Sequence, residues 1–346
     1  MRPLIAITMG DPASIGPELC ARAFAEASTY EMCRPLLVGD VGILRRAMAI
    51  DGVPRLPLHP IDDVSEASFA FGVMDVLDTN LCSPEDIPVG RVSAKAGDAA
   101  FGYVRKAIAL AMAGKVDATV TNAICKESMN LAGHSFAGHT EIYAHETGAN
   151  RYAMMLVHED MRIVHVSTHV SLREACDRVT RERVLEVIRL AHQACLDLGI
   201  AQPRIGVAGL NPHCGENGLF GQEEIVHILP AVSQARSEGM DVDGPVAPDT
   251  VYSKARGGWY DIVVAMYHDQ GHIPLKLLGF VFDRNAGAWQ AVSGVNITLG
   301  LPILRASVDH GTAFDQAGKG TASPASLLNA IRYAATMAGR KPSSQS

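Results

Sequence analysis

The sequence predicts an α/β fold with a mostly parallel sheet. Short apolar runs, such as residues 4–8 and 262–266, alternate with longer stretches whose apolar residues recur near the 3.6-residue helical period, such as residues 97–113. Strands that alternate with helices in this way are typical of parallel α/β proteins. The length of 346 residues allows two domains or one large one. No GxGxxG motif follows the first strand, so the common dinucleotide-binding fingerprint is missing.

The individual elements have local reasons. A helix is expected to begin near Gly16, because Pro17 suits a first helical turn and Glu18 faces the positive end of the helix dipole. Residues 153–157 and 163–166 are expected to pair as neighbouring strands, because only a few residues separate them. The same periodicities predict strands at 35–38, 118–120 and 204–208, and helices at 41–50, 181–198, 223–236 and 324–337.

Composition excludes several classes of protein. Hydrophobic residues make up 48% of the chain and the formal net charge is -7, which argues against disorder and against a general basic face for nucleic acid. No apolar stretch approaches the roughly 20 residues that cross a bilayer, and the N-terminus lacks a secretory signal pattern. The seven cysteines are scattered without a CxxC pair, which favours the cytoplasm and disfavours a disulfide framework.

Three histidines follow predicted strands in polar, loop-like segments. His169, His213 and His268 each lie a few residues beyond a strand end. Because ligands gather at the carboxyl ends of parallel strands, three imidazoles there could hold a divalent metal and leave positions open for a substrate. Zinc, cobalt, nickel, manganese and magnesium are all compatible with imidazole and oxygen donors. The alternative is that these are ordinary surface or core histidines, among thirteen in the chain.

A second group has the character of an anion site. His139 and Thr140 open a predicted helix, where Thr140 is expected to be the cap and free N–H groups can face a phosphate. Lys276 and Arg305 could add a point charge and a bidentate fork for a phosphorylated or carboxylated substrate. The alternative is that both are solvated surface charges. A third segment, residues 309–320, is rich in small residues that let a backbone approach a ligand, although a plain loop would look the same.

Six short motifs span nearly the whole chain: TMGDP at 8–12, GHTE at 138–141, NPHCGE at 211–216, YHDQG at 267–271, GVNITLGLP at 294–302 and DHGTA at 309–313. In this order they resemble the 4-hydroxythreonine-4-phosphate dehydrogenase (PdxA) family. Residues 309–320 also resemble the cofactor loop of isocitrate and isopropylmalate dehydrogenases, whose fold this family shares.

The resemblance implies two α/β/α lobes with a central cleft, formed by residues 1–130 with 295–346 and by residues 131–294. It implies a homodimer with an active site shared between subunits, and one divalent metal held by His169, His213 and His268, one of them from the partner subunit. It places the substrate against His139, Thr140, Lys276, Asn296 and Arg305. It places NAD against the cofactor loop, at Asp309, His310, Gly311 and Thr312.

Some segments depart from the usual family pattern. Residues 272–280 look more like the catabolic branch, which acts on 4-phospho-D-threonate or 4-phospho-D-erythronate. An extra loop at 281–293 lies between Lys276 and Asn296, where it could reshape the substrate pocket. Ser14 stands where the family usually has glycine, and residues 121–126 replace a more usual proline-containing turn. These departures bear on the choice of substrate rather than on the type of reaction.

The expected reaction is oxidation by NAD of the C3 hydroxyl of a 4-phosphorylated four-carbon acid, followed by decarboxylation of the β-keto acid. A 4-phosphohydroxy-L-threonine substrate, as in pyridoxine biosynthesis, fits the same scheme. Lys276 is expected to position or protonate the reacting groups, and Asp249 and Asp269 to orient ligand imidazoles unless they are only turn residues. Two alternatives are a dehydrogenase of a non-phosphorylated diol carboxylate and a non-catalytic metal-binding protein on this scaffold.

Overall fold

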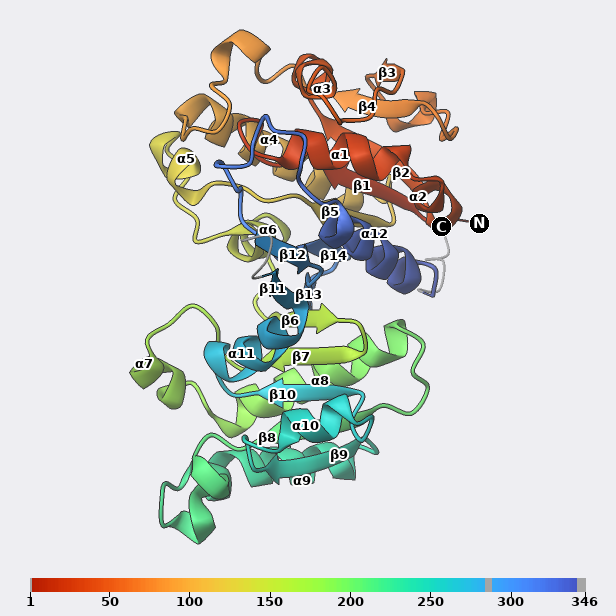
Figure 1. Ribbon diagram of the computed structural model, residues 1–346. Coiled ribbons are helices and arrows are strands. Elements are labelled where there is room, and N and C mark those ends of the chain that lie inside the picture. Colours follow the sequence, from red (N-terminus) through yellow and green to blue (C-terminus); the bar gives the residue numbers. More distant parts are fainter. Residues whose placement is uncertain (1, 284–287, 341–346) are drawn as a thin grey trace. The chain divides into compact units, whose positions relative to one another are not determined.

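The computed structural model describes residues 2–283 and 288–340, which divide into two compact units (Figure 1). Unit 1 comprises residues 2–149, 291–295 and 301–340, and unit 2 comprises residues 150–283, 288–290 and 296–300. Residues 131–149 therefore cluster with unit 1, whereas the family resemblance assigned them to the second lobe. Both units combine strands with covering helices, which confirms the predicted α/β class.

Unit 1 contains a parallel sheet with the strand order β3-β4-β2-β1-β5-β14. The strands are β1 (Leu4–Thr8), β2 (Arg34–Gly39), β3 (Leu58–Ile61), β4 (Met74–Asp78), β5 (Ala118–Thr121) and β14 (Arg305–Val308). The helices are α1 (Gly16–Ala25), α2 (Ala27–Met32), α3 (Val41–Met48), α4 (Ala94–Met112), α5 (Lys126–Leu131), α6 (His139–Thr147) and α12 (Ala325–Ala338), with 3-10 turns η1 (Val64–Glu66) and η2 (Pro84–Asp86). Strands β1 and β5 are buried along their whole length, which explains the continuous apolar run at the start of β1.

The strands that follow β1 are added to the sheet first on one side of β1 and then on the other, and this change of side defines where a ligand is expected. The chain passes from β1 to β2 through α1 and α2, but it returns from β4 to β5 through α4. Because such crossovers are right-handed, the two sets of helices cover opposite faces of the sheet. The loops after β1 and β5 therefore lie at a topological switch point, the usual location of ligands in open α/β sheets.

The strand order in unit 2 is β13-β6-β7-β10-β8-β9. The strands are β6 (Ala153–His158), β7 (Met161–His165), β8 (Arg204–Ala208), β9 (Asp241–Val246), β10 (Ile262–Ala265) and β13 (Val295–Leu299). The helices are α7 (Leu172–Asp177), α8 (Arg181–Asp197), α9 (Leu229–Ser237), α10 (Val251–Arg256) and α11 (His268–Gly279), with the 3-10 segment η3 (Pro212–Gly218) and the π-helical η4 (Glu224–Ile228). Only the β6–β7 pair, which was predicted to be neighbouring strands, is antiparallel among the pairs described in this unit.

Several elements differ from the sequence expectation. The helix predicted at 223–236 is a π-helical turn followed by α9. The extra loop at 281–293 contains two strands, β11 (Phe280–Asp283) and β12 (Ala288–Val292), which pair with each other, and its residues 284–287 lie outside the described residues. His268 is the first residue of α11 rather than part of a loop. None of the helices in residues 2–283 and 288–340 combines the length and the hydropathy of a membrane-spanning segment.

Candidate functional site

Two of the three predicted metal ligands lie together at one edge of the unit 2 sheet. His169 is exposed in the loop after β7, and His268 begins α11, a short connection after the neighbouring strand β10. Their ring centres are 5.8 Å apart. A cation about 2.1 Å from a ring nitrogen lies about 3 Å from the ring centre, so two imidazoles on one ion have centres about 5–6 Å apart. The pair therefore fits a shared metal ion.

The carboxylate of Asp269 sets the tautomer of His268. Its Oδ1 lies 2.6 Å from His268 Nδ1, so Nδ1 carries the proton as donor and Nε2 keeps its lone pair. Hydrogen bonding of the second ring nitrogen to a carboxylate is the usual support of a metal-binding histidine. The donor set around His268 thus has the chemistry that a divalent cation requires.

His213 lies apart from this pair within one chain. It belongs to η3, where His213, Cys214, Glu216 and Asn217 all adopt left-handed backbone conformations, and its side chain is exposed. No group of three histidine, cysteine or acidic side chains in the described part of the chain converges to hold a metal ion. One chain therefore supplies two of the three imidazoles to a common point.

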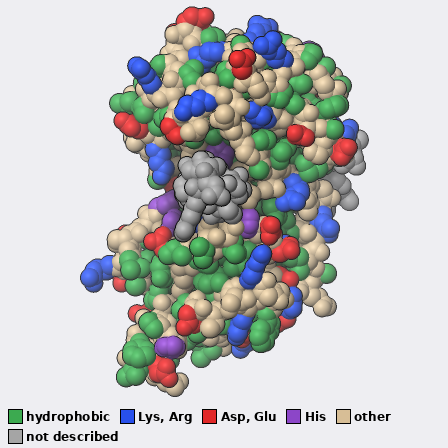
Figure 2. Space-filling model, viewed as in Figure 1, with side chains coloured by type: hydrophobic (Ala, Val, Ile, Leu, Met, Phe, Trp, Pro, Cys, Tyr) green, Lys and Arg blue, Asp and Glu red, His purple; other side chains and the backbone are tan. Residues whose placement is uncertain are grey.

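Large apolar side chains are exposed close to His213 in the sequence. Figure 2 shows hydrophobic side chains on the surface of this part of unit 2. They come from the segment just after η3: Leu219, Phe220, Ile225, Val226 and Leu229. Exposed apolar residues that gather around a functional segment are typical of a protein interface.

Two further histidines, which were not predicted to belong to the site, lie next to His268. His165 is the last residue of β7, and His272 lies one helical turn after His268. Burial, followed by the neighbouring imidazoles, lowers the pKa of His165 to about 4 and that of His272 to about 3. Both are therefore neutral near pH 7. The four-residue spacing from His268 to His272 was the available signal, because such residues share a helix face.

Unit 1 holds the anion-binding candidates. Arg305 is the first residue of β14 and is buried, with 2% exposure, so it is not the solvated surface charge of the alternative reading. Its Nη2 donates to Thr121 Oγ1 at 3.2 Å, and its guanidinium carbon lies 5.4 Å from the Tyr143 ring centre. Burial lowers the pKa of Arg305 to about 10, although Tyr143 and Glu141 oppose the shift. Arg305 is therefore cationic at neutral pH.

The first turn of α6 lies beside this cation. The N-cap of α6 is Gly138, so the expectation that Thr140 caps this helix is wrong; Thr140 is a buried first-turn residue. The Nε2 of His139 is buried and has no hydrogen-bond partner among the described residues. Burial and the charge of Arg305 hold the pKa of His139 well below its usual value. A neutral imidazole, a guanidinium and first-turn N–H groups can together hold an oxyanion.

The other predicted substrate and proton-transfer residues lie mainly in unit 2. Lys276 is two turns after His268 on α11, and its charge contributes to the lowered pKa of His272, after burial and the imidazoles of His165 and His268. Asn296 lies in β13, and its Oδ1 is buried without a hydrogen-bond partner among the described residues. Asp249 lies near η3. Burial, Glu224 and Asp249 together raise the pKa of Cys214, a residue of η3, to about 11.

The predicted cofactor loop follows β14 in unit 1. His310 Nδ1 donates to the Gly311 carbonyl at 2.8 Å, while its Nε2 is buried and has no partner in the described ranges. A side chain added at Gly311 would meet open space, so a ligand can approach the backbone there. The carboxylate of Glu18 accepts hydrogen bonds from the Gly318 and Gly320 amides, at 2.7 and 2.9 Å, and ties the end of the loop to α1. The Nε2 of His310 and the open backbone at Gly311 can therefore receive a ligand that forms hydrogen bonds.

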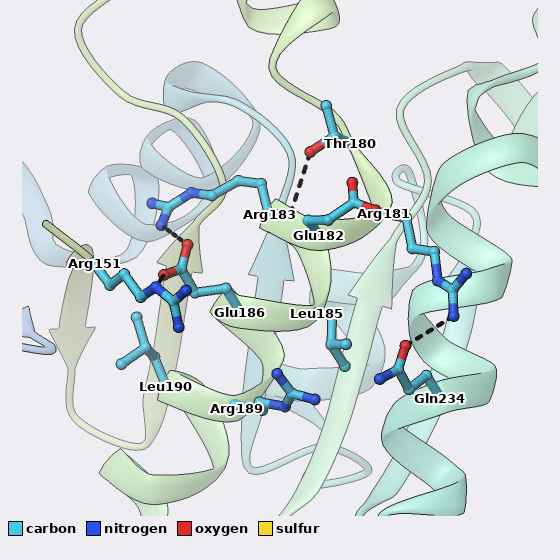
Figure 3. Close-up of a pocket in the computed structure, with 10 residues that line it drawn as sticks. All are labelled: Arg151, Thr180, Arg181, Glu182, Arg183, Leu185, Glu186, Arg189, Leu190 and Gln234. Atoms are coloured by element: carbon cyan, nitrogen blue, oxygen red, sulfur yellow. Dashed lines mark hydrogen bonds and ion pairs between the residues drawn. The ribbon is translucent and has the colours of Figure 1, made fainter.

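A surface pocket of about 780 Å³ in unit 2 contains four arginines but is not built as an anion site (Figure 3). Arg183 donates to the Tyr152 and Val166 carbonyls and to Glu186, at 2.8–3.0 Å. The others face Glu186, Gln234 and Glu238: Arg151, Arg181 and Arg189. Because the protein itself occupies these guanidinium groups, this pocket is not part of the candidate site.

Comparisons with known proteins show the family to which the chain belongs. Residues 31–334 match the family model described as pyridoxal phosphate biosynthetic protein PdxA. The chain is 48% identical, over 98% of its length and 100% of the relative, to a D-threonate 4-phosphate dehydrogenase from Pectobacterium atrosepticum. A 4-hydroxythreonine-4-phosphate dehydrogenase structure from Klebsiella pneumoniae is 46% identical, with a TM-score of 0.86 and 98% of both chains covered. A terephthalate 1,2-cis-dihydrodiol dehydrogenase structure from Burkholderia xenovorans is 34% identical, with a TM-score of 0.67 and coverage of 96% and 98%.

Proposed function

The chain belongs to the PdxA family of dehydrogenases, and we propose that it oxidises the C3 hydroxyl of a 4-phosphorylated four-carbon acid with NAD and a divalent metal, and that decarboxylation follows. The observation that carries this proposal is the His169–His268 pair, with ring centres 5.8 Å apart and the tautomer of His268 set by Asp269. The buried cation of Arg305 supports an anionic substrate. The free cysteines agree with the reducing cytoplasm as the proposed location.

Each residue has a role in this reaction. His268, through Nε2, and His169 would hold the metal, while Asp269 keeps Nδ1 of His268 protonated. A bound metal would supply Lewis-acid chemistry that lowers the pKa of the substrate hydroxyl so that its proton can leave, and bound NAD would supply the hydride acceptor. Arg305, His139 and the first-turn amides of α6 bind the phosphate or the carboxylate. Asn296 hydrogen-bonds the substrate through Oδ1, and Lys276 positions it and returns a proton to carbon after CO₂ leaves.

We propose that the active enzyme is a homodimer in which His213 of one chain completes the His169–His268 pair of the other. Of the three predicted ligands, the described residues of one chain bring His169 and His268 together, whereas His213 lies apart and is exposed on η3. The apolar residues Leu219, Phe220 and Val226 follow it in the sequence and are half or more exposed. A second copy of the chain that covers them would bury this surface and deliver the third ligand.

The proposed substrate is 4-phospho-D-threonate. The Pectobacterium relative is named for D-threonate 4-phosphate, and residues 272–280 have the sequence character of the catabolic branch. 4-Phospho-D-erythronate and 4-phosphohydroxy-L-threonine are the neighbouring candidates. The similarity to a cis-dihydrodiol dehydrogenase keeps a non-phosphorylated diol carboxylate as a second candidate function.

The test is NADH formation, followed at 340 nm, with the three phosphorylated acids and a diol carboxylate in parallel. We expect the largest kcat/KM with 4-phospho-D-threonate, loss of activity after treatment with a chelator, and recovery when Co²⁺ or Zn²⁺ is added. The same assay with D-threonate measures how much the phosphate contributes. Equal rates with and without the phosphate, or full activity in the metal-free protein, would contradict the proposal.

A further inference from the structure

Three imidazoles form a column that runs from α11 to β7 in unit 2. The rings of His268 and His272 are stacked, with centres 3.6 Å apart and planes 14° from parallel. The ring of His165 lies next to His272, at 4.8 Å between centres, and 6.5 Å from His268. His272 and His165 are buried, at 7% and 1% exposure, whereas His268 reaches the surface. The proposed metal ligand is thus the outer member of a packed histidine column.

Hydrogen bonds set the tautomer of each ring. His272 Nδ1 donates to the His268 carbonyl at 3.0 Å, and His165 Nδ1 donates to the Met154 carbonyl at 3.1 Å. Because carbonyl oxygens only accept, each Nδ1 carries a proton and each Nε2 keeps a lone pair. His272 therefore contacts His268 twice, through its ring and through the backbone of His268.

The orientation of the two stacked rings shows that His272 is not itself a ligand of the same ion. Two histidines four residues apart on a helix bind one metal ion in known metal sites. The alternative role of His272 is therefore that of a second ligand beside His268. Ring lone pairs lie in the ring plane. Because the ring planes are 14° from parallel and the ring centres are 3.6 Å apart, the lone pairs of the two rings lie in separate, nearly parallel planes and do not converge on one cation. His169, whose ring is tilted by 45° to His268, has no such restriction.

The backbone at Gly271 leaves room for the column. A Cβ at this position would lie 2.4 Å from His165 Nε2 and 2.7 Å from Ile163 Cγ2, closer than real Cβ atoms come. Only glycine therefore lets the first turn of α11 lie against His165. The stack and the close helix contact together restrict how the His268 ring can turn.

We propose that His272, supported by His165, is a positioning residue that holds the His268 ring in the plane needed for metal binding. This inference rests on the proposed metal role of His268. The stack places a ring against one face of His268, while Asp269 holds its Nδ1, so two independent contacts hold the ring orientation before any metal arrives. Preorganised ligands bind a metal more tightly than ligands that must first be ordered.

The experiment measures Co²⁺ binding by the metal-free full-length protein, from the visible absorption of the bound ion and by calorimetry. We expect His272→Leu to weaken binding about 10-fold, the lower end of the range for groups that support metal ligands. His272→Phe keeps a flat ring on His268 and should stay within about 3-fold of the wild type. His192→Leu, on α8, is the matched control and should leave Co²⁺ affinity unchanged. Thermal unfolding of each variant verifies the fold, and His272→Asn, which can still donate to the His268 carbonyl, replaces the Leu variant if that does not fold.

The outcomes separate this inference from the proposed function. Wild-type protein that binds no Co²⁺ would remove the metal role on which both rest. Wild-type binding with unchanged affinity in His272→Leu would overturn the positioning role alone. Complete loss of Co²⁺ in His272→Leu, equal to that in His268→Leu, would make His272 a ligand and would also overturn it, as would equal weakening in the Phe and Leu variants. A spectrum of bound Co²⁺ that changes in His272→Leu, together with a lower kcat at similar KM, would support it.

Discussion

The two halves of the candidate site differ in how many of their groups one chain brings together. The anion region of unit 1 consists of Arg305 and His139, and the imidazole region of unit 2 consists of His169, His213 and His268. Arg305 is 2% exposed and is surrounded by Thr121, Tyr143 and His139 of the same unit. In unit 2, the His268 side chain is 35% exposed, and His169 and His213 are exposed. A buried guanidinium must be satisfied during folding because desolvation of a charge is costly. Exposed imidazoles remain hydrated and have no such requirement. The metal site that they form can therefore be completed after folding, by a metal ion and a second chain.

The largest expected effect is loss of activity when an imidazole of unit 2 is removed, and its recovery when two such variants form a mixed dimer. His169→Ala and His213→Ala should each lower kcat/KM by about three orders of magnitude or more and reduce bound metal, because each removes a proposed ligand. If His213 comes from the partner, a heterodimer of the two variants contains one site with both defects and one native site. Unfolding and refolding an equal mixture should therefore recover about a quarter of wild-type activity, as random assortment of subunits requires.

The control for this experiment is a mixture of His169→Ala with His268→Ala. Both of these histidines lie in the same chain near one point, so every mixed dimer keeps a defect in each site and no activity should return. Recovery in this control but not in the first mixture would mean that His268, rather than His213, crosses the subunit boundary. Metal content measured on each refolded mixture should follow the activity.

A second prediction concerns burial in unit 1. Asp11 lies at the switch point after β1, is fully buried and accepts a hydrogen bond from the Ala13 amide at 2.8 Å. Burial raises the pKa of Asp11 from 3.8 to about 6. A raised pKa in the folded state means that folding takes up a proton, so the stabilisation is present below pH 4 and is lost as the pH rises through 6.

Asp11→Asn keeps the acceptor for Ala13 but cannot ionise. Relative to the wild type, its free energy of unfolding should therefore rise by up to about 3 kcal/mol between pH 4 and pH 7. Urea unfolding at pH 4.5 and 7.5 measures this change, and Asp62→Asn, at an exposed carboxylate, is the control. A difference between variant and wild type that does not change with pH would show that Asp11 does not carry this cost.

The sequence predicted those parts of the fold that are encoded locally. Strand β8 and helix α8 have strong periodicities and were placed within a residue of their ends. The short strand β3, at Leu58–Ile61, is only partly buried and gives almost no apolar run. Helix α11 contains Gly271 and Pro274, residues of low helix propensity, so its packing on β6, β7 and β10 decides its conformation.

The site was predictable to a similar extent. His169 and His268 follow adjacent parallel strands, so the expectation that residues after strand ends meet holds for their positions. His213 also follows a strand next to β10, but the left-handed turn of η3 intervenes, and its backbone conformation has no periodic signal. The burial of Arg305 depends on β5, far away in the sequence, which no local pattern reveals.

A third prediction tests the preformed anion region. Arg305→Lys keeps the charge but loses the planar fork, so KM for the phosphorylated substrate should rise by about 10- to 100-fold, corresponding to about 1.5–3 kcal/mol for a hydrogen bond to a charged group. We expect only a small change in the midpoint of thermal unfolding beside this large change in KM. Arg105→Lys, at an exposed ion pair with Glu146 in the same unit, is the control. An unchanged KM would remove Arg305 from the substrate site.

The smallest expected effect concerns the packing that supports the exposed region. Gly271→Ala would bring a methyl group within 2.4 Å of His165 Nε2, and neither β7 nor the first turn of α11 can easily move. Such overpacking typically costs about 1–3 kcal/mol of unfolding free energy. Gly257→Ala is the matched control, because its nearest new contact is at 3.4 Å and its φ of -77° suits alanine. Urea unfolding should separate the two variants. Since a shift of α11 also moves His268, Gly271→Ala should bind Co²⁺ more weakly than the control, whereas equal affinities would mean that the imidazole region tolerates displacement of its helix.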